Sequence, residues 1–339
     1  MNKRKMVISP EIGHYEAELF LNQEQKFKFA SAAIKTFDLS LFEKFDFNEA
    51  SKTMLSEFNG LLNLNNPDTM LRRFHKMQID GTAPESYREH AFKISEGKHV
   101  LAGIRHAGGN KEKPFINIWP SYTFTGLQEI RDMYQLIARH FDVFRPGYLS
   151  FWLSPATNIS KELEKQVDPC LRYLVGSRSK LLMQASFSKS LEVSLIKIKD
   201  KSYREWYEKL YKDFHSENSA LKDWVPVNDD ECMSQCMSDG LLYYIEVNGL
   251  KAGLIAGMKK PLLGMSAIYF TEILLSKEFK GQNLAPVAQR KFIEQLPEDI
   301  ELVWGTIDSK NISSTKTAFR VGRKAIRNEF FLPVSLNHY

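Results

Sequence analysis

Residues 269–323, YFTEILLSKEFKGQNLAPVAQRKFIEQLPEDIELVWGTIDSKNISSTKTAFRVGR, decide the fold that we predict for this chain. Their pattern is typical of strand, loop, helix, strand, loop and helix. Ile268 to Leu275 is apolar and suits a buried strand. Ser276 to Asn283 is polar and contains Gly281, which is typical of a loop.

A helix is predicted after this loop. Apolar residues recur at helical spacing from Leu284 to Leu296, and the proline that follows ends the pattern. Glu301 to Ile307 has the character of a second strand. Asn311 and Ser313 are candidate caps of a short helix that ends at Gly322. The stretch therefore predicts an α/β arrangement.

The loop before Leu284 is a candidate anion site. At a helix N-terminus the backbone N–H groups lack partners and the helix dipole adds partial positive charge, so phosphate binds well there. Lys280 adds a full charge nearby. The alternative is an ordinary strand–helix–strand unit in which Gly281 only makes the turn.

Three separated elements of this stretch resemble the GNAT family of N-acetyltransferases. The family has a strand with an acidic residue, here Glu272-Ile273-Leu274-Leu275, and then a loop of the type Gln/Arg-x-x-Gly-x-Gly/Ala, here residues 278–283. After the next strand it has an Asn that opens a helix ending in Gly, here Asn311 and Gly322. The resemblance covers about the C-terminal 150 residues. Ala318 stands where many members have a tyrosine acid, so the general acid stays open.

The resemblance implies an acyl-CoA N-acyltransferase-like mixed sheet with flanking helices. It further implies an acetyltransferase that moves an acetyl group from acetyl-CoA directly to an amine, with Glu272 as the base. The oxyanion would be bound by the backbone N–H of Leu274 or Leu275. The residues implied to bind acetyl-CoA are Ile273, Leu274, Leu275, Lys280, Gly281, Gln282, Asn283, Leu284, Ala285, Asn311 and Ser314.

Glu272 also stands out without any resemblance. It is the only acidic residue in an otherwise apolar strand. Burial disfavours a charged carboxylate and raises its pKa toward the range of a working base. The alternative is a glutamate at the strand end that faces solvent or pairs with a lysine.

The N-terminal half repeats the same order of elements after an initial helical segment. Residues 90–105 predict a hairpin, and a strand, a helix, a strand and a further helix start follow up to about residue 160. We interpret this half as a degenerate second copy of the C-terminal fold; an unrelated α/β domain is the alternative. Gly176 to Lys180 is the predicted linker. The predicted domains are therefore residues 1–180, helical segment plus degenerate copy, and residues 181–339, the GNAT acetyltransferase domain.

Composition limits the class of protein. The chain has 339 residues, of which 43% are hydrophobic and 26% charged, as in globular proteins, and its length suggests two domains. Its net charge of +5 suits an anionic cofactor without requiring nucleic acid. No apolar run reaches membrane-spanning length, and the basic N-terminus lacks the apolar core of a secretory signal. We expect no membrane partner and a cytoplasmic location.

The three cysteines do not predict a metal site. Cys232 and Cys236 could share one helical face, but no histidine stands at a matching spacing for the remaining ligands. A small, odd number of cysteines suits a reducing cytoplasm.

Two other functions compete with acetyl transfer. One is an aminoacyl transferase built on two copies of a related fold and using charged tRNA; it would need a basic groove between the halves, and the sequence has no dense Lys/Arg run. The other is a non-catalytic CoA-binding or interaction protein that kept the fold. The acceptor, a small molecule or a peptide amine, and the oligomeric state stay open.

Overall fold

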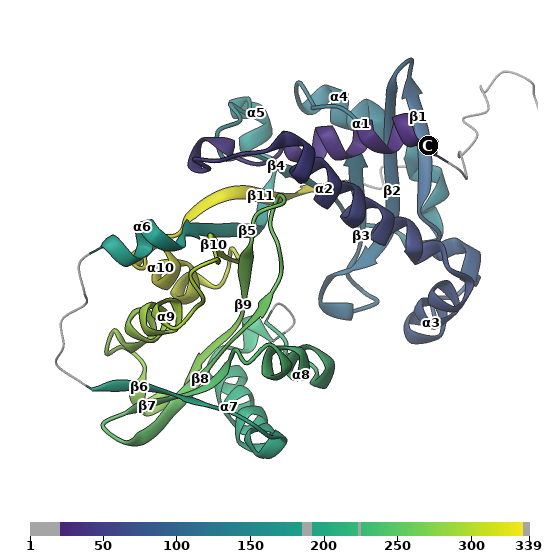
Figure 1. Cartoon of the computed structure of the whole chain (residues 1–339). Coiled ribbons are helices and arrows are strands. Elements are labelled where there is room, and N and C mark those ends of the chain that lie inside the picture. The colour runs from purple at the N-terminus through teal and green to yellow at the C-terminus, as the bar shows by residue number, and fades with distance from the viewer. Residues whose placement is uncertain (1–20, 185–191, 223–224, 335–339) are drawn as a thin grey trace, which may run out of the picture.

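The computed structural model describes residues 21–184, 192–222 and 225–334. These residues form one mixed sheet of eleven strands in the order β1-β2-β3-β4-β11-β5-β10-β9-β8-β7-β6, with helices packed along it (Figure 1). The predicted α/β class, a mixed sheet with flanking helices, is therefore confirmed.

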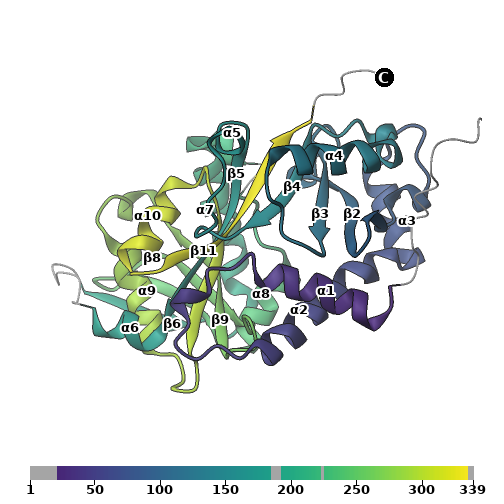
Figure 2. The ribbon, with the colours of Figure 1, turned by 90° about the horizontal axis from the view of Figure 1, so that it is seen from above.

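The N-terminal half supplies three helices and then the first strands. Its elements are α1 (Gln23–Ile34), α2 (Phe47–Leu62), α3 (Pro67–Met77), β1 (His90–Ser95), β2 (Lys98–His106), β3 (Pro114–Pro120), α4 (Leu127–Ile137), β4 (Tyr148–Leu153) and α5 (Lys161–Glu164). Helices α1 and α2 cover one face of these strands and α4 covers the other (Figure 2). Asn66 caps α3, and Pro67 occupies the first helical position.

The C-terminal half contains residues 269–323, for which the strand–loop–helix pattern is predicted. Its elements are β6 (Val193–Lys197), α7 (Arg204–Glu217), α8 (Asp230–Ser238), β7 (Leu242–Val247), β8 (Leu250–Lys259), β9 (Ala267–Leu275), α9 (Leu284–Glu294), β10 (Leu302–Asp308) and α10 (Ile312–Arg320). The β7–β8 hairpin turns at Asn248 and Gly249, whose φ angles of 50° and 78° are those of a type I′ turn.

Two strands in the middle of the sheet were not predicted. β5 (Asp168–Ser177) pairs with β10 and β11, and β11 (Lys324–Pro333) pairs with β4 and β5. The expected linker from Gly176 to Lys180 is instead the end of β5 and the start of α6 (Arg178–Met183). The absence of a side chain at Gly176 lets Leu181 pack closely against β5, since an added Cβ would lie 2.7 Å from Leu181 Cδ1. The division at residue 180 remains a prediction.

The sheet has the same layout on both sides of the β5/β11 pair. On one side lie β4, β3, β2 and β1; on the other lie β10, β9, β8 and β7, with β6 beyond them. β3/β4 and β9/β10 are parallel pairs, and every other neighbouring pair is antiparallel.

Strand β9 is buried on both faces, and this fixes the position of the candidate site. On one face Ile268 and Phe270 pack against Phe292 of α9. On the other face Leu274 packs with Tyr207 of α7, and α8 adds to the same core. Figure 1 shows α9 and α10 on one side of β9 and α7 and α8 on the other.

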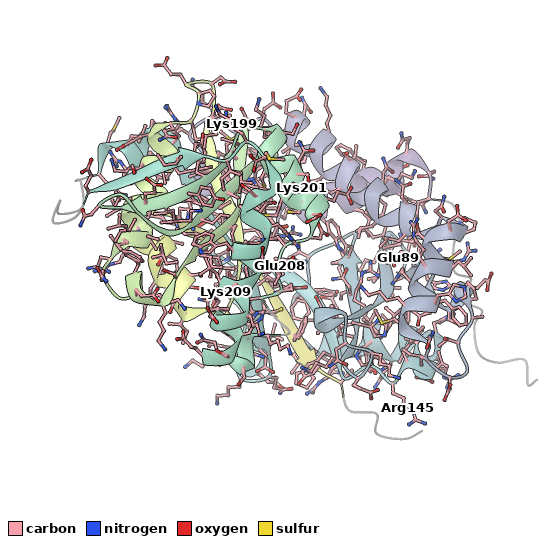
Figure 3. The ribbon with its side chains drawn as sticks, turned by 90° about the horizontal axis from the view of Figure 1, so that it is seen from below. Glu89, Arg145, Lys199, Lys201, Glu208 and Lys209 are labelled. Atoms are coloured by element: carbon pink, nitrogen blue, oxygen red, sulfur yellow. The ribbon has the colours of Figure 1, made fainter. Side chains whose placement is uncertain are left out.

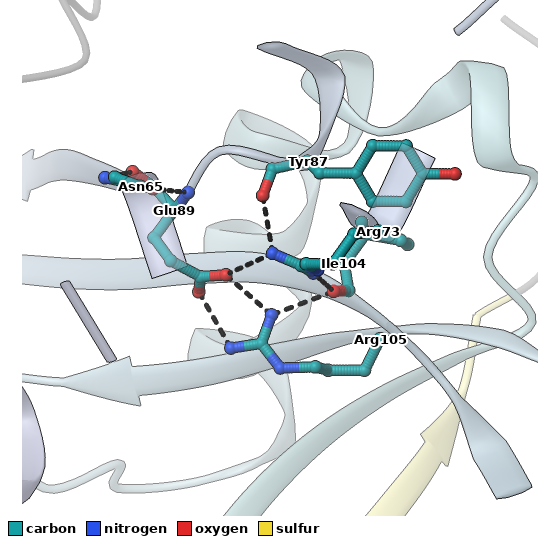
Figure 4. A network of polar contacts seen from close by, with 6 residues as sticks. All are labelled: Asn65, Arg73, Tyr87, Glu89, Ile104 and Arg105. Atoms are coloured by element: carbon teal, nitrogen blue, oxygen red, sulfur yellow. Dashed lines mark hydrogen bonds and ion pairs between the residues drawn. The ribbon is translucent and has the colours of Figure 1, made fainter. Parts of the chain in front are cut away.

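A buried ion-pair network fastens α3 to the N-terminal strands (Figure 4). Glu89, 5% exposed, accepts from Arg105 at 2.6 and 3.0 Å and from Arg73 at 3.4 Å. Both arginines also donate to the carbonyl of Ile104, at 2.8 and 2.5 Å. Gly103 makes room for the carboxylate, because a Cβ there would lie 2.0 Å from Glu89 Oε2.

Candidate functional site

β9 and β10 are paired for only part of their length. The parallel register runs from Leu302↔Ala267 to Trp304↔Tyr269, and the strands separate beyond it. On its other edge β9 has a bulge against β8, where Thr271 is the extra residue between Phe270 and Glu272. A bulge bends and twists its strand, so β9 turns away from β10 here.

A cavity of about 640 Å³ occupies the space between the separated strands. Residues of β9, β10, α7, α9 and α10 and the loop before α9 line it. The predicted site residues in its wall are Glu272, Ile273, Leu274, Leu275, Lys280, Gly281, Ala285, Asn311 and Ser314. The structure thus brings nine of the twelve predicted residues to one cavity.

The other three predicted residues, Gln282, Asn283 and Leu284, are not part of this wall. Gln282 donates to the carbonyl of Glu278 at 2.7 Å, and Leu284 is 3% exposed in the core between α9 and the sheet. Asn283 caps α9 in the left-handed region, with φ of 59°, and accepts from Arg320. These three residues shape the turn.

Glu272 is buried and accepts three hydrogen bonds on one oxygen. Its side chain donors to Oε2 are Tyr207 Oη at 2.6 Å, Tyr211 Oη at 2.7 Å and Asn228 Nδ2 at 3.1 Å. Burial raises the pKa of Glu272, and these hydrogen bonds oppose the rise. At 8% exposure, and with no ion pair among the described residues, the alternative of a solvent-facing or lysine-paired Glu272 is wrong.

The two tyrosines come from one face of α7, four residues apart. Burial, and then the charge of Glu272, raise the pKa of both hydroxyls, so both stay protonated and donate. Tyr211 lines the cavity, and Tyr207 is fully buried. Glu208 and Lys209 lie on the exposed face of the same helix (Figure 3).

Asn228 is a site residue that the sequence did not indicate. Besides Glu272 it contacts Tyr207, whose hydroxyl lies 3.3 Å from both its backbone N and its Nδ2. It precedes α8 in a polar stretch without periodicity. A polar residue in such a stretch has no pattern that separates it from surface asparagines.

The loop before α9 has the geometry of an anion cradle. Gly281 has φ of 78°, and nothing lies within 4 Å of a Cβ built on it, so a ligand can approach its backbone closely. Lys280 Nζ lies 3.2 Å from Glu217 Oε2, and Lys277 lies 2.9 Å from the other oxygen. The exposed Glu278 side chain is not in the cavity wall.

Asn311 caps α10 as predicted. Its Oδ1 accepts from the backbone N of Ser314 at 3.2 Å, and both residues face the cavity. Three buried polar residues in the same wall were not predicted: Gln289, Asp308 and Arg323.

The structure separates the two candidate oxyanion donors. Ser276 N donates to Ala252 O of β8 at 2.9 Å. Because N–H groups alternate in direction along a strand, Leu274 N–H also faces β8, and Leu275 N–H faces the cavity side. Leu275 is the better-placed donor.

Within the described residues no group of three or more His, Cys, Asp or Glu could hold a metal ion, and Cys170, Cys232 and Cys236 are free thiols. None of the described helices is long and apolar enough to cross a membrane.

Comparisons by sequence give no match, either to a family model or to a curated protein. Solved structures do match. A GCN5-related N-acetyltransferase from Sphaerobacter thermophilus is 11% identical, with 78% of this chain and 84% of that chain covered and a TM-score of 0.49. A GNAT-family acetyltransferase from Colwellia psychrerythraea is 8% identical, over 79% and 96%, with a TM-score of 0.42. The C-terminal domain of a protein provisionally named a lysylphosphatidylglycerol synthetase, from Agrobacterium fabrum, is 9% identical, over 80% and 93%, with a TM-score of 0.36. These likenesses are too distant to assign an activity.

Proposed function

We propose that this protein is an N-acetyltransferase that moves an acetyl group from acetyl-CoA to the amine of a small molecule or peptide. One observation carries the proposal. A single cavity between two diverging parallel strands is lined by a glycine turn at a helix N-terminus and by a buried carboxylate with a raised pKa. Anion cradle and base are the two groups that this reaction needs from the protein.

The proposed cofactor site uses mostly backbone. The pyrophosphate would bind the open N–H groups at Gly281 and the start of α9, with Lys280 as the nearby cation. The thioester arm would lie along Ile273 to Leu275 of β9, whose β10-facing edge is unpaired. Asn311 and Ser314 would contact it from the opposite wall. The donor set fits a phosphorylated thioester.

The reaction forms one C–N bond and breaks one C–S bond. Glu272 accepts a proton from the acceptor amine as the nitrogen attacks the thioester carbonyl carbon. The N–H of Leu275 donates to the carbonyl oxygen as its negative charge develops. The amide forms as the sulfur leaves as a thiolate, which takes a proton to give free CoA. Ala318, fully buried, supplies no proton, so the thiolate would take its proton from water.

The N-terminal half is proposed to be a degenerate copy that lost this site. The matching strand layout on both sides of β5/β11 supports the copy. The ladder between β3 and β4 ends at Asn117↔Ser150, as that between β9 and β10 ends early. Beyond it Arg327 lies between aromatic rings, its Cζ 4.5 Å from the centroid of Trp152 and 5.5 Å from that of Trp119. Side chains of the protein therefore fill the space between β3 and β4 that corresponds to the cavity between β9 and β10.

Titration calorimetry of the full chain with acetyl-CoA tests the proposal, and desulfo-CoA or free adenosine serves as a control for partial binding. Thiol release is then measured with amines, peptides and aminoglycosides as acceptors. Binding with release supports acetyl transfer. Binding without release by any acceptor favours the non-catalytic alternative. Absence of binding, with transfer from charged tRNA, favours the aminoacyl transferase.

The proposed location is the cytoplasm.

A further inference from the structure

A buried arginine in the cavity wall has two guanidinium nitrogens without a hydrogen-bond partner among the described residues. Arg323 follows Gly322 at the end of α10 and is 3% exposed. Its guanidinium lies 4.8 Å from the ring centroid of Phe270 in β9 and lines the cavity. Gly305 in β10 faces it, and a Cβ built there would be in ordinary contact with Arg323 Nη1, at 3.4 Å.

Neither Nε nor Nη1 of Arg323 has a hydrogen-bond partner among the described residues. Burial lowers the pKa of Arg323 to about 10, which still leaves the side chain charged at neutral pH. A buried, unpaired charge is strongly unfavourable, and buried arginines normally have a carboxylate. Arg73 and Arg105, which keep 20% and 22% of their side chains exposed, both contact the carboxylate of Glu89 (Figure 4).

Two other polar side chains of the cavity wall, Asp308 and Gln289, do not pair with the guanidinium of Arg323. Asp308 forms no ion pair with it, and accepts instead from Lys310 N at 2.8 Å. Gln289 of α9, 1% exposed, has an unpaired Oε1 and lines the same cavity. The unpaired Gln289 atom is an acceptor, whereas the unpaired Arg323 atoms are donors. A ligand that brings an acceptor group into the cavity can use the donors of Arg323.

The position of Arg323 separates it from the phosphate end. Phe270 and Gly305 stand where β9 and β10 begin to diverge, one residue beyond the last paired residues, Tyr269 and Trp304. From Phe270 to Leu275, where the glycine loop follows, the strand advances five residues, or roughly 16 Å at about 3.3 Å per residue. A phosphate bound at the loop does not reach Arg323. Glu272, the proposed base, stands only two residues from Phe270, so the substrate groups that react beside it lie nearer to Arg323.

We propose that Arg323 binds a carboxylate carried by one of the two substrates. A planar guanidinium binds a carboxylate with two parallel hydrogen bonds, which neutralises the buried charge on both sides. The carboxylate is either the free end of a dicarboxylic acyl thioester or the carboxylate of an amino-acid acceptor. The inference rests on the proposed acyl transfer and narrows its substrate class.

Succinyl-CoA and butyryl-CoA form a matched pair for the first source, since both have four-carbon acyl chains and only one ends in a carboxylate. Calorimetry of the full chain should show succinyl-CoA binding at least tenfold more tightly. Arg323→Gln should remove that preference. Arg139→Met, which replaces an exposed arginine of the other half, should leave it unchanged. Retained butyryl-CoA binding by Arg323→Gln shows that this variant is folded.

The second source, the carboxylate of an amino-acid acceptor, is tested without CoA. The unfolding temperature is measured with 10 mM glutamate or succinate and compared with that in the corresponding amides. A shift in wild type that is absent in Arg323→Gln supports carboxylate binding, and a shift with glutamate alone assigns it to the acceptor. Equal binding of both thioesters, together with no Arg323-dependent shift, overturns the inference and leaves acyl transfer intact. If no thioester binds, the proposed function fails, and the carboxylate shift alone decides this inference.

Discussion

Tyr211 donates a 2.7 Å hydrogen bond to Oε2 of Glu272, the same oxygen to which Tyr207 donates at 2.6 Å. The second carboxylate oxygen is left for the cavity and the nearby backbone. Two elements far apart in sequence, α7 and β9, thus orient one carboxylate. This arrangement holds a base in one position without neutralising its charge by a cation.

Replacement of Glu272 by Gln should lower turnover about a hundredfold or more, because a general base contributes about that factor. The affinity for acetyl-CoA should stay near that of wild type, since the loop holds the cofactor with backbone groups. Steady-state kinetics and calorimetry on the same variant measure the two effects. Glu278→Gln, at an exposed carboxylate near the same loop, is the matched control and should keep full turnover. A Glu272→Gln variant with wild-type turnover would show that another group takes the proton.

The pH profile should report the pKa of Glu272. Burial raises that pKa above the ordinary value of 4.5, and a base acts only when ionised, so the rate should rise with pH through the raised value. Removing a donor from Oε2 raises the pKa further. Tyr211→Phe should therefore move the acidic limb to higher pH, with the plateau rate less affected. Tyr243→Phe, which removes a hydroxyl bonded to Gly240 O, is the control. An unchanged limb in Tyr211→Phe would contradict the assignment of that limb to Glu272.

The periodic elements of the site could be predicted from the sequence because their signals are local. The apolar run of β9, the helical spacing after Leu284 and the Asn311 cap each appear within one short window, and all three are present. The carboxylate of Glu272 was recognised because a lone charge in an apolar strand is costly.

The remaining features depend on contacts between distant segments. β5 contains Arg172 and ends in Gly176 and Ser177, so its composition resembles that of a loop. It is nevertheless a central strand, because it pairs with a neighbouring strand on each edge. Asn228 joins Glu272 across 44 residues. Arg323 lines the cavity because the fold brings the end of α10 against Phe270 of β9. No local pattern contains this information.

Gly281→Val should weaken acetyl-CoA binding about tenfold or more, which corresponds to about 1.4 kcal/mol. The residue has φ of 78°, and the branched side chain would occupy the space through which a phosphate approaches the backbone. Gly97→Val is the matched control, since Gly97 has φ of 74° and equally open surroundings but lies in the β1–β2 turn. Both variants should lose similar stability, and only Gly281→Val should lose affinity, as measured by calorimetry. Equal affinity in the two variants would remove the loop from the cofactor site.

The Glu89 network should matter for stability and not for the reaction. Arg105 Nη1 and Glu89 Oε1 are 2.6 Å apart, with the Glu89 side chain 2% exposed; Lys52 Nζ and Glu49 Oε1 are also 2.6 Å apart, but 71% and 51% exposed. Breaking a buried pair leaves uncompensated charge, while an exposed pair is hydrated and screened.

Urea unfolding should therefore show that Glu89→Gln lowers the free energy of unfolding by about 3 kcal/mol, the lower end of the range for a broken buried pair, because Arg73 and Arg105 keep 20% and 22% of their side chains exposed. Glu49→Gln should change it by less than about 0.5 kcal/mol. Glutamine keeps the shape that fits against Gly103, so the difference reports charge and not volume. Both variants should bind acetyl-CoA as wild type does at low urea, since neither residue lines the cavity. Equal, small losses in the two variants would mean that water reaches Glu89 and that the network is no stronger than a surface pair.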